Sequence, residues 1–304
     1  MSIGGRVGHG IQARPPYLNV AFTVSAAAVR AAIKVAVGLG ITRTEPVVLA
    51  DGANVIVHMR PSPVVAKVAA STTEVRPDTA AWLQRELDVA SFLAEVGIPV
   101  LEPSPEIPAT TYHGDGHVMS FWRYLRSAGD TRPSEATVGS MLRDLHAALR
   151  SYPGEGEVPV LAPLNDIPAF LARPQTRLTA GQAAALAAAY TRLTAELDRT
   201  SWTGQTLHGD AGVGNLMAAD SRWVWHDFED TCSGPVTWDL AASTARLGAP
   251  RILAAYGEPV HAGQLAVCEQ LRRLHLTVWY GLYAERFPDL RPRAAELLAL
   301  WPAP

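Results

Sequence analysis

Apolar residues in the first third of the chain recur at spacings that predict a small mixed unit of helices and strands. Helical spacing predicts helices over residues 22–40, with Ser25 as N-cap, and over residues 78–96. Short apolar segments between turn residues predict strands over residues 46–50, 54–60 and 64–70, and a strand pair around Thr110 and Val118. This part of the chain is therefore expected to form a sheet with one or two helices.

The pattern changes after Phe121, where long amphipathic stretches with helical spacing dominate. The stretch 153–174 is rich in proline and predicts loops. The other predicted elements are helices over 134–151 and 179–200, strands over 215–219 and 222–226, and mostly helical structure over 236–300. We therefore predict an α+β protein with a flexible N-terminal tail over residues 1–20, a small lobe over 21–121 and a larger, mainly helical lobe over 122–304.

Composition excludes several classes of protein. The 304 residues include 26 Lys and Arg against 29 Asp and Glu, and a net charge of −3 provides no basic field for nucleic acid. Two cysteines, Cys232 and Cys268, are too few for a disulfide framework and predict reduced thiols. No segment has the roughly 18 uninterrupted apolar residues of a membrane span, and the first residues lack the apolar part of a signal peptide. We expect a cytoplasmic monomer or homodimer without nucleic-acid or membrane partners.

The most informative segment starts at His208-Gly209-Asp210, continues to Asn215 and reaches Asp227 twelve residues later. A turn between the two predicted strands brings Asn215 and Asp227 to the same end of a hairpin, where an amide oxygen and a carboxylate oxygen can share Mg²⁺. Asp210 is then free to receive or orient the proton of a hydroxyl group. The glycine in this loop lets the backbone bend closely around that arrangement.

This segment resembles the catalytic segment of the aminoglycoside phosphotransferase and choline kinase superfamily, the small-molecule relatives of protein kinases. The family pattern of His-Gly-Asp, Asn and Asp-Phe is followed here by Gly234-Pro235 and Asp239-Leu240-Ala241. The resemblance implies a bilobed, protein-kinase-like fold that transfers the γ-phosphoryl group of ATP, with GTP as an alternative donor, to a hydroxyl group. It also implies that Asp210 is the catalytic residue, that Asn215 and Asp227 hold Mg²⁺, and that His208 and Asp239 brace the loop.

The first lobe supplies the expected nucleotide side. The only lysines of the chain are Lys34 and Lys67, and Lys67 lies in an apolar strand, as a kinase lysine that holds the α- and β-phosphates does. Glu86 on the next predicted helix is the expected partner of its ammonium group, with Glu95 as the alternative. The other predicted nucleotide contacts are Gly52 and Asn54 in the turn between the first two strands, and Ser120 and Trp122 at the expected hinge, whose backbone would bind the adenine edge.

Two alternative functions stay open at this point. The residues His208, Asp210, His226 and Asp227 could be the ligands of a metal-dependent phosphoesterase, although that set leaves Lys67 without a role. A non-catalytic, nucleotide-binding pseudokinase is the second alternative. A protein kinase with a switchable activation loop is disfavoured because only six residues separate Phe228 from Pro235.

The acceptor is the least defined part of the prediction. Seven arginines face five acidic residues over 241–304, and four face five over 151–200, so neither helical segment is strongly acidic. We therefore expect a neutral or weakly cationic hydroxylated acceptor, such as a sugar, an amino sugar or an antibiotic, in resistance or in metabolism. The residues expected around it are Glu229, Asp230, Glu269, Trp279 and Tyr283.

Overall fold

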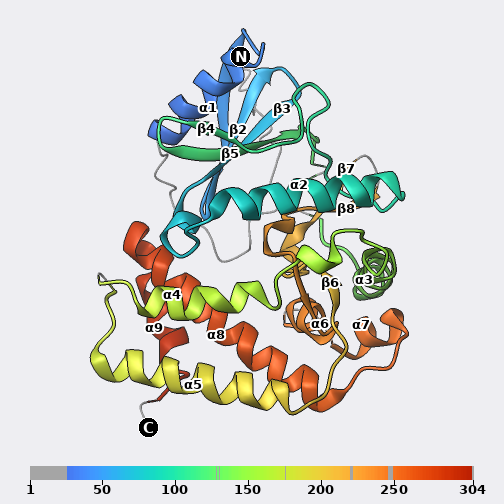
Figure 1. Cartoon of the computed structure of the whole chain (residues 1–304), viewed down its shortest axis with the longest axis vertical. Coiled ribbons are helices and arrows are strands. Elements are labelled where there is room, and N and C mark those ends of the chain that lie inside the picture. The colour runs from blue at the N-terminus through green and yellow to red at the C-terminus, as the bar shows by residue number, and fades with distance from the viewer. Residues whose placement is uncertain are drawn as a thin grey trace, which may run out of the picture.

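The computed structural model describes residues 26–302, apart from residues 128, 130, 175, 220, 221 and 246–248. The predicted tail over residues 1–20 and the predicted N-cap Ser25 lie outside the described residues. Within them, the chain forms two lobes, a sheet-containing N-terminal lobe and a mainly helical C-terminal lobe (Figure 1). The predicted α+β, bilobed, kinase-like architecture is confirmed.

The N-terminal lobe is built on an antiparallel sheet of five strands in the order β1-β2-β3-β5-β4. The strands are β1 (Thr44–Asp51), β2 (Asn54–Pro61), β3 (Val64–Ala69), β4 (Tyr112–Gly114) and β5 (His117–Arg123). The central strand β3 is buried along its whole length between β2 and β5. Because β5 continues to Arg123, the sheet extends two residues beyond the expected lobe boundary at residue 121.

Two helices flank this sheet. Helix α1 (Ala26–Gly38) buries its alanines against Ala66 and Val68 of β3, because small side chains allow close contact with the sheet. Helix α2 (Thr79–Glu95) begins after Asp78, whose side chain accepts a hydrogen bond from the backbone of Ala81. Helix α2 lies between the sheet and the C-terminal lobe (Figure 1), and its residues Leu87 and Leu93 belong to the same buried cluster as the helices of that lobe.

Long amphipathic helices form the C-terminal lobe, as predicted. They are α3 (Glu135–Leu149), α5 (Ala180–Asp198), α6 (Thr237–Thr244), α7 (Ala249–Tyr256), α8 (Ala262–Arg286) and α9 (Arg291–Leu298). Thr179 and Gln182 form a capping box before α5. One prediction was wrong: the proline-rich stretch 153–174 contains a helix, α4 (Asp166–Leu171), because its apolar residues Ile167 and Phe170 pack into the core of the lobe.

Two small two-stranded sheets carry the loops that the sequence singles out. Strand β6 (Gln205–Leu207) pairs with β9 (Cys232–Gly234), and β7 (Leu216–Ala219) pairs with β8 (Arg222–Trp225). Each strand of the second pair is one residue shorter than predicted, and Asn215 lies in a short 3₁₀ turn before β7. None of the helices in the described residues is long and apolar enough to cross a membrane.

Candidate active site

Lys67 lies on the central strand β3. Its neighbours Ala66 and Val68 face α1, so the side chain of Lys67 lies on the opposite face of the sheet. Its ammonium group contacts both carboxylate oxygens of Glu86 at 2.9 Å. It also lies 2.5 Å from Oδ1 of Asp227 and 3.0 Å from Oε2 of Glu229. The predicted Lys67–Glu86 pair is therefore present, and a carboxylate of the C-terminal lobe joins it.

Lys67 and Asp227 hold each other ionised, whereas burial raises the pKa of Glu86 to about 8 and also raises the pKa of Glu229. Burial alone would lower the pKa of Lys67, but the negative charges of Asp227, Glu229 and Glu86 raise it well above its ordinary value. Burial would raise the pKa of Asp227, but the charge of Lys67 lowers it to about 2. Oxygens of Glu86, Asp227 and Glu229 all lie within 4.8 Å of one another. These three carboxyl groups around one ammonium offer oxygen ligands of the kind that suits a hard divalent cation.

The loop after β6 is held by Asp239, from the first turn of α6. Its carboxylate accepts hydrogen bonds from the backbone N–H groups of His208 and Gly209, each at 2.9 Å, and the His208 ring bonds to the carbonyl of His226. Gly209 has φ of +86°, and a Cβ there would lie 1.7 Å from the carbonyl oxygen of Asp230. Only glycine fits this position, because a side chain would meet the backbone. The expected bracing by His208 and Asp239 is thus visible as hydrogen bonds.

Asp210 follows on this loop with its side chain partly exposed. Asn215 donates its side-chain amide to Oδ2 of Asp210 at 3.0 Å and to the Asp210 carbonyl at 2.7 Å. Arg272 of α8 forms an ion pair with Oδ1 and donates to the Gly209 carbonyl at 2.8 Å. Sequence reasoning missed Arg272, because nothing in the spacing of α8 marks it. With its N–H₂ group used in this way, Asn215 keeps its amide oxygen available as a ligand.

The predicted nucleotide contacts fall into two groups. Gly52, Asn54 and Trp122 line a cavity of about 1280 Å³ between the lobes, together with Lys67 and Glu86. Ser120 does not line this cavity: it is fully buried in β5, and its hydroxyl accepts a hydrogen bond from the Trp122 indole. The predicted hinge was therefore placed too early, because the strand continues through Arg123 and the connection between the lobes follows it.

The predicted acceptor residues Glu229, Asp230, Glu269, Trp279 and Tyr283 all line the same cavity. Two of them also bind cations of the protein. Glu229 pairs with Lys67 and accepts a hydrogen bond from Asn54 at 2.8 Å, and Asp230 forms an ion pair with an arginine at 2.7 Å.

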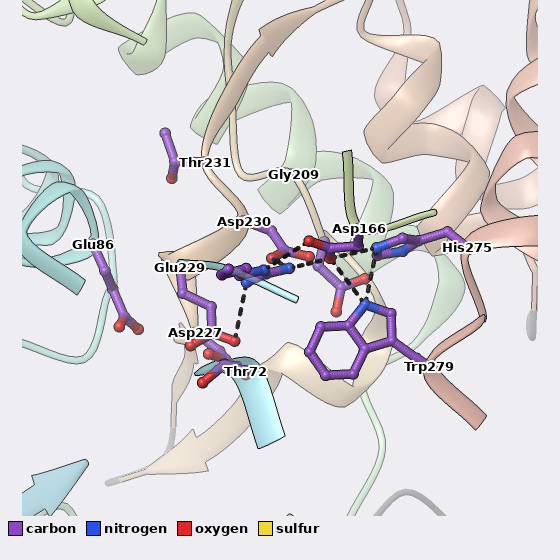
Figure 2. A network of polar contacts seen from close by, with 12 residues as sticks. Thr72, Glu86, Asp166, Gly209, Asp227, Glu229, Asp230, Thr231, His275 and Trp279 are labelled. Atoms are coloured by element: carbon purple, nitrogen blue, oxygen red, sulfur yellow. Dashed lines mark hydrogen bonds and ion pairs between the residues drawn. The ribbon is translucent and has the colours of Figure 1, made fainter. Parts of the chain in front are cut away.

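That arginine, Arg76, is the second cation that sequence reasoning missed. Its contacts place it beside Asp166, Glu229 and Asp230, and Asp166 also contacts His275 and Trp279. Figure 2 shows these five partner residues close together. Asp166 was predicted to lie in a loop, and Arg76, between the predicted strand 64–70 and the predicted helix 78–96, was given no role. Their partners lie far away along the chain, so no local pattern could have identified them.

Comparison with known proteins gives a consistent result. The sequence model of the phosphotransferase enzyme family matches residues 50–274, more than half of the chain. No curated protein sequence matches the chain significantly.

Among solved structures, amicoumacin kinase hAmiN in complex with AMP-PNP, Ca²⁺ and Ami has a TM-score of 0.62 and 12% identity, covering 84% of this chain and 87% of that chain. Choline kinase LicA from Streptococcus pneumoniae has a TM-score of 0.61 and 15% identity, over 88% and 98% of the two chains. A choline/ethanolamine kinase family protein from Mesorhizobium loti has a TM-score of 0.57 and 21% identity, over 90% and 91%. At these identities the similarity shows a shared fold.

Proposed function

This chain belongs to the phosphotransferase enzyme family, and from its site we propose that it transfers the γ-phosphoryl group of ATP to a hydroxyl of a neutral or weakly cationic small molecule. The proposal rests on the 2.5 Å contact between Lys67 of the N-terminal lobe and Asp227 of the C-terminal lobe, at the cavity between the lobes. This contact joins a cation suited to phosphate with a carboxylate suited to a metal ion. Phosphoryl transfer needs this combination, because positioning and charge neutralisation dominate its catalysis.

The donor side is assigned by charge and ligand type. Lys67 would hold the α- and β-phosphates, with Glu86 keeping its ammonium in place. Asn215 and Asp227 offer the oxygen ligands that Mg²⁺ prefers, and Mg²⁺ supplies neutralisation of the phosphate charge when bound. Nucleotide and divalent ion occur together in the amicoumacin kinase structure, which supports the same requirement here. ATP is the proposed donor, and GTP is the alternative.

Asp210 is the proposed catalytic residue. Asn215 and Arg272 bind its two oxygens, so the carboxylate has a fixed direction toward the cavity. A hydroxyl group bound there would be oriented for attack on the γ-phosphorus. Its proton would pass to Asp210 as the new O–P bond forms and the bond between the γ-phosphorus and the β,γ-bridging oxygen breaks, with ADP as the leaving group.

The residues of α8 that line the cavity, here called the acceptor wall, favour a substrate without many positive charges. Arg272 already neutralises Asp210, and Arg273 adds another cation to the cavity lining beside Glu269. A polycation needs a concentration of unpaired carboxylates, and this wall does not provide one among the described residues. The aromatic side chains of Trp279 and Tyr283 offer an apolar surface instead, which suits a sugar, an amino sugar or a small antibiotic.

An ADP-release screen tests this proposal. The purified enzyme with Mg·ATP is assayed against aminoglycosides, amino sugars, choline and uncharged sugars, with Asp210→Ala as the control. We expect turnover with uncharged or singly charged acceptors, and a loss of about 10²–10⁴-fold in Asp210→Ala with ADP affinity retained. A strong preference for polycations would overturn the charge argument. Unchanged turnover in Asp210→Ala would remove the assigned role of that residue.

The four side chains proposed as metal ligands of a phosphoesterase do not form one metal site among the described residues. His208 is fully buried, and its ring bonds to the His226 carbonyl and packs 4.3 Å from the Phe228 ring. In the described part of the chain, the close group of metal-ligand side chains contains Glu86, Asp227 and Glu229 but no histidine. The same screen distinguishes an active kinase from a pseudokinase, because a wild-type pseudokinase would bind nucleotide without turnover.

A further inference from the structure

Arg76 crosses from the N-terminal lobe into the C-terminal lobe and is buried there. It precedes α2, and its side chain is only 2% exposed. Nε lies 3.1 Å from Oδ1 of Asp166 and Nη2 lies 2.7 Å from Oδ2, a two-pronged contact with α4. The same Nη2 lies 2.7 Å from Oδ1 of Asp230. The guanidinium also lies 3.9 Å from the ring centre of Trp82.

On one side, this guanidinium reaches the segment that carries Asp227. Asp230 is its direct partner, and Oε1 of Glu229 lies 3.5 Å from Nη1. The other oxygen of Glu229 lies 3.0 Å from Lys67. Glu229 is therefore held between the two buried cations of the site, and the position of the Asp227 backbone depends on both.

On the other side, the same contact reaches the acceptor wall. Oδ2 of Asp166 accepts a hydrogen bond from the Trp279 indole at 3.1 Å and lies 3.0 Å from Nε2 of His275. Both residues belong to α8 and line the cavity. Figure 2 shows Asp166 between Asp230 on one side and His275 and Trp279 on the other. The network thus links the phosphate side of the cavity to the acceptor side.

We propose that Arg76 is a positioning residue of the transfer reaction, one that fixes the Asp227–Asp230 segment against helix α8; this inference rests on the proposed function. Without its guanidinium, Asp166 and Asp230 would lose the buried cation that they share, and Glu229 would keep only Lys67. Their repulsion would displace the segment and move Asp227 away from its place opposite Lys67. A lysine at position 76 would restore the charge but not the planar fork that spans two carboxylates.

The test compares Arg76→Met and Arg76→Lys with the wild type. Isothermal titration calorimetry measures the dissociation constants of Mg·ADP and of metal-free ADP, and steady-state assays measure kcat and the KM for the acceptor. Arg173→Met is the matched control, because Arg173 pairs with Glu285 and Glu74 and does not line the cavity.

We expect Arg76→Met to weaken Mg·ADP binding about tenfold or more while leaving metal-free ADP binding within about twofold, since Arg76 acts through the Asp227 segment. The kcat should fall in parallel, Arg76→Lys should be intermediate, and Arg173→Met should match the wild type. Equal weakening of ADP binding with and without metal, or behaviour of Arg76→Met like that of Arg173→Met, would overturn the proposal.

A second variant covers the case in which Arg76→Met does not fold, as judged by circular dichroism. Asp230→Asn removes one partner and leaves the Asp166 contact in place, and it should shift metal-dependent ADP binding in the same direction by a smaller factor. Wild-type protein that binds no Mg·ADP at all would refute the proposed function itself. Wild-type binding with unchanged binding in Arg76→Lys and Asp230→Asn would refute only the positioning role of Arg76.

Discussion

The orientation of the Asp210 carboxylate is fixed by the two groups that bind its oxygens. Asn215 holds one oxygen from the same loop, and Arg272 holds the other from α8, over a chain separation of 62 residues. Arg272 itself is fixed by the Gly209 carbonyl and lies 4.9 Å from the ring centre of Trp238. A carboxylate held in this way has a fixed direction, which orients a hydroxyl group better than a freely rotating one.

Replacing Arg272 tests this view at the level of one residue. In Arg272→Gln, Asp210 loses an ion pair and a directional constraint, so we expect kcat to fall about 10- to 100-fold with the KM for ATP little changed. Steady-state kinetics measure the effect, with Arg192→Gln on the exposed face of α5 as control. Retention of full kcat in Arg272→Gln would show that Asn215 alone suffices to orient Asp210.

Helix α6 acts as an element that fixes the loop between β6 and β7. Its residue Asp239 is fully buried and accepts two backbone hydrogen bonds from that loop and one contact from His146 at 3.1 Å. Burial would raise the pKa of Asp239, but the hydrogen bond from His146 and nearby positive charge lower it. The loop is therefore held by an ionised carboxylate, and its stability is linked to pH.

Asp239→Asn tests this linkage. A carboxyl with a lowered pKa in the folded state stabilises the protein above its unfolded pKa of about 3.9, and this contribution is lost as the pH falls further. We expect the variant to reduce the free energy of unfolding by about 1–3 kcal/mol at pH 7, and the difference from the wild type to shrink below about pH 4. Urea denaturation at both pH values measures it, with exposed Asp144→Asn as control. A difference that stays constant with pH would contradict an ionised Asp239.

At the scale of the whole molecule, Arg76 and Arg286 cross between the lobes in opposite directions. Arg76 reaches from the N-terminal lobe to Asp166, and Arg286 reaches from the end of α8 to the turn between β1 and β2. Arg286 pairs with Asp51 and donates to the Gly52 carbonyl at 2.8 Å. The lobes also share one buried cluster through α2. The helix that lines the acceptor side therefore also holds the turn that covers the nucleotide side.

Arg286→Met should release that turn. We expect the KM for ATP to rise about fivefold, corresponding to about 1 kcal/mol, because the buried carboxylate of Asp51 loses its ion pair and Gly52 loses a donor. The KM for the acceptor should change less, since Arg286 contacts the opposite lobe. Kinetics of both substrates measure this, with Arg291→Met from the start of α9 as control. An unchanged KM for ATP would show that the turn is held by the sheet alone.

The sequence alone determined the features that depend on neighbours along the chain. Turn residues predicted where the strands end, helical spacing predicted α2, α3 and α5, and the loop motif identified Asp210 and Asn215. Lys67 stood out because a lone lysine in a buried strand needs a counter-charge, and the next helix supplied Glu86. These inferences succeed because backbone conformation and pairing between adjacent elements follow from local spacing.

The tertiary structure decided the partners of Arg76, Arg272 and Arg286. Each is one of many arginines in the chain, and each meets its carboxylate across 90, 62 and 235 residues respectively. It also decided that Glu229 and Asp230, which line the cavity, pair with the buried cations Lys67 and Arg76. The ion-pair partner of a charged side chain depends on the groups that surround it in the folded protein. A local sequence pattern therefore does not predict which of several distant carboxylates a given arginine will neutralise.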